Sequence, residues 1–212
     1  MEQKMKKCVI IGSVPLPDDS AVREFGRENC FVICADGGYD SAVRVGIRPD
    51  LLIGDFDSLE GRLPENIETV RLRVEKDDTD SMAAVREGLR RGFREFILIG
   101  LIGGTRFDHS IANLCVLSYL CRQGCKAVLW DAESRIFLIR ESGLTLTGMK
   151  GATVSVFPFG CNSCNVSYTG LKYPLTKKTL YADFPLAVSN RIEADTARVV
   201  VHSGDALVIV LP

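Results

Sequence analysis

The segment LLIGDFDS, residues 51 to 58, places two carboxylates one residue apart at the end of a strongly apolar run. In an extended backbone alternate side chains point to the same face, so the Cα atoms of Asp55 and Asp57 would lie roughly 7 Å apart on one face. Like charges at that spacing repel. Such a pair is typical of a cation bound between the carboxylates, of one protonated carboxyl, or of two solvated groups in a loop.

Similar polar clusters follow other apolar runs in the first part of the chain. They comprise Asp36, Gly37 and Gly38 after the run 31–35, Asp77, Asp78, Thr79 and Asp80 after 69–74, and Gly103, Gly104, Arg106, Asp108, His109 and Asn113 after 95–101. Ligands of open parallel sheets bind beyond the carboxyl ends of the strands. Any one of these motifs alone is also common turn chemistry. Their joint placement predicts a single site.

The chemistry of this cluster favours a divalent cation and a phosphate chain. Many carboxylates at one edge need a counter-charge, and Mg²⁺ takes hard oxygen ligands, usually one or two carboxylates plus substrate phosphates. Glycine backbone N–H groups can approach a phosphate closely, and Arg106 can fork onto its oxygens. Either Thr79 or Asp80 can cap a helix while the other faces the metal or ligand. The sequence has neither a dinucleotide-binding glycine fingerprint nor a P-loop.

The elements that must position these residues fall into two groups. Up to about residue 130, short apolar runs alternate with helical stretches, a pattern typical of a mostly parallel sheet covered by helices. The expected strands are 7–13, 31–37, 50–56, 69–74, 95–101 and 127–132, and the expected helices are 18–28, 39–46, 78–92 and 108–124. Glycines at 92 and 124 predict left-handed helix ends.

After Ser134 the sequence becomes a series of short alternating segments separated by Gly, Asn, Asp and Ser. The expected strands there are 134–141, 143–148, 152–159, 164–170, 196–202 and 205–212, the signature of an antiparallel sandwich or barrel. We therefore predict an α/β domain over residues 1–132, carrying the nucleotide and metal site, and an all-β sandwich domain over residues 133–212.

Composition excludes several classes of protein. The chain has 212 residues, 26 Lys and Arg against 27 Asp and Glu, and a pI near 6.2, so it has no electrostatic footprint for nucleic acid. Its longest apolar stretch is well short of the ~20 residues that span a bilayer. Cysteines in apolar runs indicate reduced thiols and a cytoplasmic location. Cys161 and Cys164 form one C-x-x-C, and a structural zinc site would need a second pair of ligands.

The motifs together resemble those of the thiamine pyrophosphokinase (thiamine diphosphokinase) family. The segments that carry the resemblance are ADGGYDSA, PDLLIGDFDSL, EKDDTDSMAA, GGTRFDHSIANL and, in the β-rich part, GLKYPL followed by VSN. The resemblance covers nearly the whole chain in the right order. It implies an α/β domain followed by a β-sandwich, and a homodimer with active sites where the subunits meet. It also implies Mg²⁺-dependent transfer of the pyrophosphoryl group of ATP to the hydroxyl of thiamine.

The resemblance also assigns roles to residues of this sequence. It places Asp55, Asp57, Asp77 and Asp80 in the catalytic acidic site, with Asp55, Asp57 and Asp77 as metal ligands. It implies nucleotide binding by Asp36, Gly37, Gly38, Thr79, Arg106, Asp108, His109 and Asn113, and thiamine binding by Ser189 and Asn190. Many family members read G-x-x-G-G-R-x-D-H, whereas here Thr105 lies between Gly104 and Arg106 and lengthens the loop by one residue.

Two other functions remain open at this point. The first is a diphosphokinase of the same type acting on another alcohol such as a pterin, since the metal and ATP motifs say little about the acceptor. The second is a non-catalytic protein, either a thiamine- or nucleotide-binding sensor or a structural protein whose acidic edge binds divalent ions. All four site aspartates are present, which speaks against a decayed site.

Overall fold

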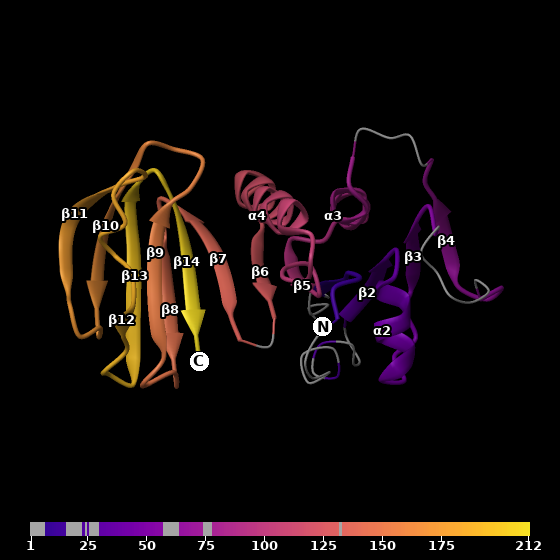
Figure 1. Cartoon of the computed structure of the whole chain (residues 1–212), viewed down its shortest axis with the longest axis horizontal. Helices are drawn as coiled ribbons and strands as arrows, with labels where there is room; N and C mark the ends of the chain where they lie inside the picture. The colour runs from indigo at the N-terminus through magenta and orange to yellow at the C-terminus, as the bar shows by residue number, and fades with distance from the viewer. Residues whose placement is uncertain are drawn as a thin grey trace, which may run out of the picture. The chain divides into compact units, whose positions relative to one another are not determined.

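The chain divides into two compact units, each with its own core. The computed structural model describes residues 7–15, 23, 25, 30–56, 64–73, 78–131 and 133–212. Unit 1 is Met1–Ala132 and unit 2 is Glu133–Pro212. Unit 1 mixes helices with strands and unit 2 is built of strands (Figure 1). The predicted fold class, a mostly parallel α/β part followed by a β-sandwich, is confirmed.

The sheet of unit 1 is parallel at every strand pair. Its strand order is β6-β5-β1-β2-β3-β4, with β1 in the interior of the sheet. The strands are β1 (Lys7–Ile11), β2 (Cys30–Ala35), β3 (Leu51–Gly54), β4 (Glu68–Arg71), β5 (Glu95–Ile99) and β6 (Lys126–Trp130). Strands β1, β3 and β5 are almost fully buried, as expected of strands covered on both faces.

Helices cover both faces of this sheet. They are α2 (Gly38–Arg44), α3 (Asp80–Arg90) and α4 (Phe107–Arg122). Ala42 of α2 packs on one face with Val9 and Ile11, and α3 and α4 lie on the other side (Figure 1). The predicted left-handed helix ends are confirmed, with φ of 90° at Gly92 and 70° at Gly124. The helix expected at 18–28 lies outside the described residues apart from two positions.

Unit 2 is an antiparallel sandwich of two four-stranded layers. The layers have the orders β12-β9-β14-β7 and β11-β10-β13-β8. The strands are β7 (Arg135–Arg140), β8 (Gly143–Thr147), β9 (Thr153–Pro158), β10 (Ser163–Thr169), β11 (Leu175–Tyr181), β12 (Asn190–Arg191), β13 (Thr196–Ser203) and β14 (Asp205–Leu211). Inward-facing residues of both layers, such as Val156, Val166, Val199 and Val208, form its core.

The sequence prediction omitted two of these strands. β11 reads LTKKTLY and buries only Leu180 below a tenth of its surface, so its apolar alternation is too weak to mark a strand. β12 has two residues and exists only through its pairing with β9. Among the helices of the described residues, none is both long and apolar enough to cross a membrane.

Candidate active site

The loops that leave the carboxyl ends of the unit 1 strands contact one another. We call this edge of the sheet the carboxyl edge. The N–H of Gly12, just after β1, donates to the carbonyl of Ile99 at 2.8 Å, and Val14 N–H donates to Gly100 O at 2.9 Å. The loop after β1 and the loop after β5 are thereby joined by backbone hydrogen bonds.

The loops after β2 and β3 are packed equally closely. Asp36 has a positive φ of 48°, and its N–H donates to Ile53 O at 2.9 Å. A Cβ on Gly54 would lie 3.1 Å from the Cα of Asp36, so glycine at 54 allows this approach. Asp36 and Asp55 are both half-buried. Two carboxylates thus leave the carboxyl edge from neighbouring strands.

Gly38 has a packing reason to be glycine. A Cβ at this first residue of α2 would lie 2.0 Å from the carbonyl oxygen of Ile11, which no side chain could tolerate. Gly37 is less constrained, because its Cβ would lie 3.2 Å from the Cβ of Ser13. Gly38 therefore allows the start of α2 to pack against the end of β1, and this packing role is independent of any ligand.

Helix α3 begins at the same edge, and Thr79 caps it. The Thr79 hydroxyl accepts the N–H of Met82 at 3.2 Å and lies 3.0 Å from the Ser81 hydroxyl. Of the two residues that could have capped the helix, Thr79 does so. Asp80 is the first helical residue and is half-buried.

A buried hydrogen-bond chain joins α3, α4 and the loop after β5. Ser81 donates to Asn113 Oδ1 at 2.6 Å, and Asn113 Nδ2 donates to the carbonyl of Leu101 at 2.5 Å. Ser81 and Asn113 are each 6% exposed. Sequence reasoning predicted Asn113 as a nucleotide ligand and missed Ser81. In the structure the Asn113 amide uses both its ends to position the loop.

Arg106 and Asp108 form an exposed pair at the start of α4. The guanidinium donates from Nε to one carboxylate oxygen at 3.0 Å and from Nη2 to the other at 2.7 Å. This hydrogen bonding to Arg106 lowers the pKa of Asp108 to about 2. Both side chains are about two-thirds exposed, and His109 is exposed beside them. The fork-shaped contact fixes the guanidinium in one orientation.

The loop between β5 and α4 is shaped by glycine and by one serine. Gly103 and Gly104 have φ of 91° and 68°, a region that side chains rarely adopt. The N–H of Gly103 donates to the Ser110 hydroxyl at 3.1 Å. The extra residue Thr105 is therefore accommodated in a left-handed loop, and this loop is tied to the first turns of α4.

Some predicted ligands cannot be placed. Asp57 and Asp77 lie outside the described residues. Asp78 forms an ion pair with Arg86 of α3. Within the part of the chain that the structure describes, no three His, Cys, Asp or Glu side chains gather into a set that could hold a metal ion. Asp55 is thus the one predicted metal ligand whose position can be described.

In unit 2 the predicted pair Ser189 and Asn190 holds a neighbouring loop. Ser189 has a positive φ of 59°, and its N–H donates to the hydroxyl of Ser155 at 3.0 Å. Asn190 is 7% exposed; its Oδ1 accepts the Tyr173 N–H at 3.0 Å and its Nδ2 donates to the Tyr173 carbonyl at 2.7 Å. Tyr173, which sequence reasoning did not select, is 62% exposed.

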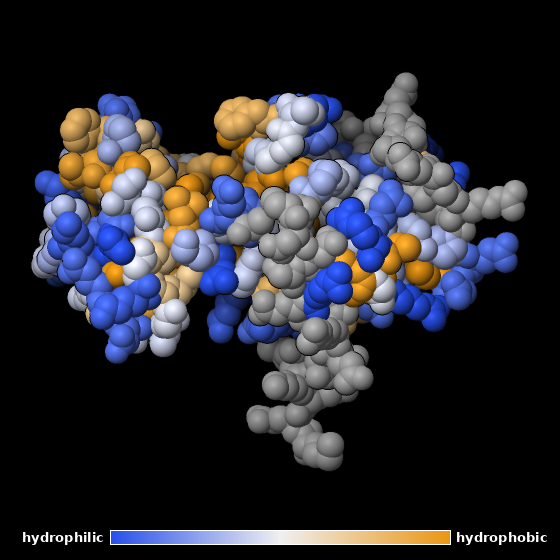
Figure 2. Space-filling model, turned by 60° about the horizontal axis from the view of Figure 1, so that its bottom comes forward, coloured by the Kyte–Doolittle hydropathy of each residue, from blue (hydrophilic) through white to orange (hydrophobic). Residues whose placement is uncertain are grey.

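Apolar side chains reach the surface of unit 2. Phe184, Leu186 and Val188, in the segment that leads to Ser189, are each more than two-fifths exposed. Figure 2 shows hydrophobic residues beside hydrophilic ones on the drawn face of this unit. The surroundings of Ser189 therefore offer both hydrogen-bonding groups and apolar surface.

Comparison with known proteins identifies the family. Residues 22–129 match the model described as "Thiamin pyrophosphokinase, catalytic domain", and residues 137–208 match "Thiamin pyrophosphokinase, vitamin B1 binding domain". The chain belongs to the thiamin pyrophosphokinase family. The two matches fall within unit 1 and unit 2 respectively, and every site residue predicted from the sequence, from Asp36 to Asn190, lies in a matched part of the chain.

Relatives of the thiamin pyrophosphokinase family match nearly the full length of the chain. The thiamine pyrophosphokinase of Bacillus subtilis is 26% identical over 197 residues, covering 89% of this chain and 90% of that protein. Its crystal structure has a TM-score of 0.87, with 23% identity and 97% of this chain and 99% of that chain covered. The thiamin pyrophosphokinase structure from Geobacillus thermodenitrificans has a TM-score of 0.83, with 24% identity and 97% of both chains covered. These two structures show the shared fold.

Proposed function

We propose that this chain is an ATP-dependent diphosphokinase that converts thiamine into thiamine diphosphate. The pyrophosphoryl group of ATP is transferred to the thiamine hydroxyl, and AMP leaves. The observation that carries the proposal is the match, in order, to both the catalytic and the vitamin B1 binding domains of the family. The second match favours thiamine over a pterin alcohol as the acceptor, and the first match, to the catalytic domain, favours an enzyme over a sensor.

The reaction is a direct attack of the thiamine hydroxyl on the β-phosphorus, with no covalent enzyme intermediate. Transfers of this kind depend on positioning and charge neutralisation more than on protein nucleophiles. We assign the positioning of ATP to Asp36, Gly37, Gly38, Thr79, Arg106, Asp108, His109 and Asn113. Support comes from Arg106, whose guanidinium is pre-oriented by Asp108 and exposed for a phosphate. Asn113 then acts through the loop that carries Arg106.

The metal in this proposal is Mg²⁺, held by Asp55, Asp57 and Asp77. Carboxylate oxygens are the donors that this ion prefers, and half-buried Asp55 at the carboxyl edge fits such a role. When bound, the ion would neutralise charge on the phosphate oxygens. Asp80, at the start of α3, is the proposed acceptor of the proton that the thiamine hydroxyl loses.

Thiamine recognition is assigned to Ser189, Asn190 and the exposed ring of Tyr173. Asn190 binds both the N–H and the carbonyl of Tyr173, so the main chain that carries the ring is held beside Asn190. A flat, positively charged ring system such as the thiazolium of thiamine is attracted to the face of an aromatic ring. Recognition would thus combine one aromatic face with the polar groups beside it.

The assembly and the cell compartment are also proposals. We infer a homodimer with active sites at the subunit interface, which the family resemblance supports. A cytoplasmic location is supported by the eight cysteines, all of which are free thiols. Sedimentation of the purified chain tests the first, and counting thiols in protein purified without reductant tests the second.

The decisive experiment is an assay of AMP and thiamine diphosphate with ATP, Mg²⁺ and thiamine. Asp57→Asn and Asp55→Asn should each reduce turnover by orders of magnitude and leave the melting temperature nearly unchanged, because each removes a charge without removing volume. Glu95→Gln is the matched control, since Glu95 lies at the opposite edge of the same sheet, paired with Lys126 at 3.8 Å.

The outcomes separate the parts of the proposal. If the unaltered chain forms no thiamine diphosphate, the proposed function is wrong. If it does, and Asp57→Asn keeps full turnover, Asp57 has no part in the mechanism. If turnover proceeds undiminished after chelation of divalent ions, the assigned metal role fails.

A further inference from the structure

Two cysteines lie against the same backbone segment at one end of the unit 2 sandwich. Cys161 is in the turn between β9 and β10, and Cys164 is the second residue of β10. The Cys161 Sγ is 3.4 Å from the carbonyl oxygen of Asp205, and it accepts the Asp205 N–H at 3.5 Å. A Cβ placed on Gly204 would lie 3.2 Å from the Cβ of Cys164. Both cysteines therefore border the Gly204–Asp205 peptide.

This peptide is held firmly. The turns β9–β10 and β13–β14 both cross from one layer of the sandwich to the other, and they meet where Phe159 N–H donates to Asp205 O at 3.1 Å. The buried carboxylate of Asp205 accepts two hydrogen bonds from Arg140, at 2.6 and 2.9 Å. The cysteines thus share one rigid neighbour, and this limits how far apart they can move.

The two thiols differ in access and acidity. Cys161 is half-buried, whereas Cys164 is 1% exposed. Burial, with the neighbouring Cys161 and Asp205, raises the pKa of Cys164 to about 11. The thiolate is the nucleophile in exchange, so Cys164 alone is almost inert toward a reagent in solution. The more accessible Cys161 can therefore react with a reagent in solution, and the buried Cys164 can react only with Cys161.

We propose that Cys161 and Cys164 form a thiol–disulfide exchange site for low-molecular-weight disulfides. The Cys161 thiolate attacks one sulfur of the small disulfide, which forms a mixed disulfide and releases one small thiolate. Cys164 then loses its proton and attacks the Sγ of Cys161, which releases the second small thiol. The two cysteines are oxidised to one disulfide, and the small disulfide is reduced to two thiols.

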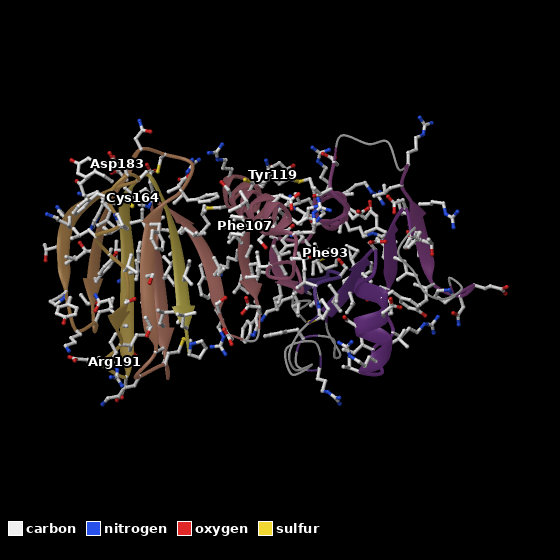
Figure 3. All side chains as sticks on the ribbon, in the orientation of Figure 1. Phe93, Phe107, Tyr119, Cys164, Asp183 and Arg191 are labelled. Carbon is white, nitrogen blue, oxygen red and sulfur yellow. The ribbon has the colours of Figure 1, made fainter. Side chains whose placement is uncertain are left out.

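This site is separate from the proposed thiamine subsite and does not rest on the proposed function. Figure 3 shows Cys164 near one end of the sandwich and Arg191, the neighbour of Asn190, near the opposite end. Oxidation would remove the thiol proton that Cys161 donates to the carbonyl of Asp205. It would therefore act on the turns that join the two layers of the sandwich.

The test treats the native full-length chain with glutathione disulfide, blocks remaining thiols with a maleimide, and maps peptides by mass spectrometry. The expected product is a Cys161–Cys164 disulfide, with no glutathione retained there and full reversal by a thiol reductant. In Cys164→Ala the second step is lost, so glutathione should stay attached to Cys161. Cys161→Ser should leave Cys164 unreacted.

Controls keep the result decisive. Cys115→Ser removes an exposed thiol of α4 and should leave the Cys161–Cys164 reaction unchanged. Circular dichroism verifies that each variant is folded. The proposal is overturned if the unaltered chain retains glutathione on Cys161 without forming the disulfide, if neither cysteine reacts, or if Cys164 reacts equally fast in Cys161→Ser.

Discussion

Replacing Asn113 by alanine tests whether the buried chain of hydrogen bonds holds the carboxyl edge together. The change removes the donor to Leu101 O and the acceptor of Ser81, both in a buried setting. A buried polar group left without its partner costs about 1–3 kcal/mol. Two such groups give an expected loss of about 2–6 kcal/mol, a large part of the ~5–15 kcal/mol that stabilises a typical domain.

Urea unfolding followed by tryptophan fluorescence measures this loss in unit 1. Trp130 is the only tryptophan, lies in β6, and packs edge-on against Phe25 with ring centroids 4.8 Å apart. Its emission therefore reports the unfolding of unit 1, the unit that contains Asn113. The midpoint should fall while the slope with denaturant stays constant, because the unfolded surface is unchanged.

Comparison with Ser81→Ala separates the chain of hydrogen bonds from a general packing effect. Ser81→Ala leaves one buried group, the Asn113 oxygen, without its donor and removes the contact with the exposed Thr79 hydroxyl, so it should cost less than Asn113→Ala. The double variant should cost less than the sum, because the two residues share one hydrogen bond. An Asn113→Ala protein within about 0.5 kcal/mol of the original, a change usual for surface sites, would refute the reasoning.

Two further predictions concern recognition and pH. Asn190→Ala frees both backbone groups of Tyr173, so the KM for thiamine should rise about tenfold, equivalent to ~1.4 kcal/mol, while the KM for ATP is unchanged; equal effects on both would contradict the assignment. Hydrogen bonds from Arg90 and Arg91 lower the pKa of Glu87 from 4.5 to about 2. Its stabilising effect is then complete above about pH 4.5 and is lost as the pH falls toward 2. Glu87→Gln should be less stable than the original at pH 7. The difference in the free energy of unfolding between the two proteins, measured with urea, should disappear as the pH falls toward 2.

The sequence was sufficient to predict the elements whose signals are local. Thr79 marks the start of α3 through its side-chain chemistry, and glycine at 92 and 124 marks where α3 and α4 end. The apolar runs predict the parallel strands of unit 1 because those strands are buried on both faces. β11 was not predicted because its lysines face solvent and only Leu180 is buried.

The contacts within the site depend on tertiary structure and could not be predicted. Ser81 and Asn113 are 32 residues apart, and Asn190 and Tyr173 are 17 apart. Asn113 and Asn190 were predicted as ligands because an amide in a polar motif has no visible partner in a sequence. Only the packing of α3 against α4 reveals that Asn113 joins Ser81 to the carbonyl of Leu101, and only the packing of the 171–173 segment against β12 reveals that Asn190 binds backbone.

The way Asn190 holds Tyr173 has a consequence for how acceptor choice could diverge. Both hydrogen bonds go to the main chain, so the loop keeps its path whatever side chain position 173 carries. The ring is 62% exposed, and the Lys172 ammonium lies 5.5 Å from the ring centroid. Under the proposed role of Tyr173 in recognition, exchanging this one ring for another would change which alcohol is accepted without altering the main chain that carries it.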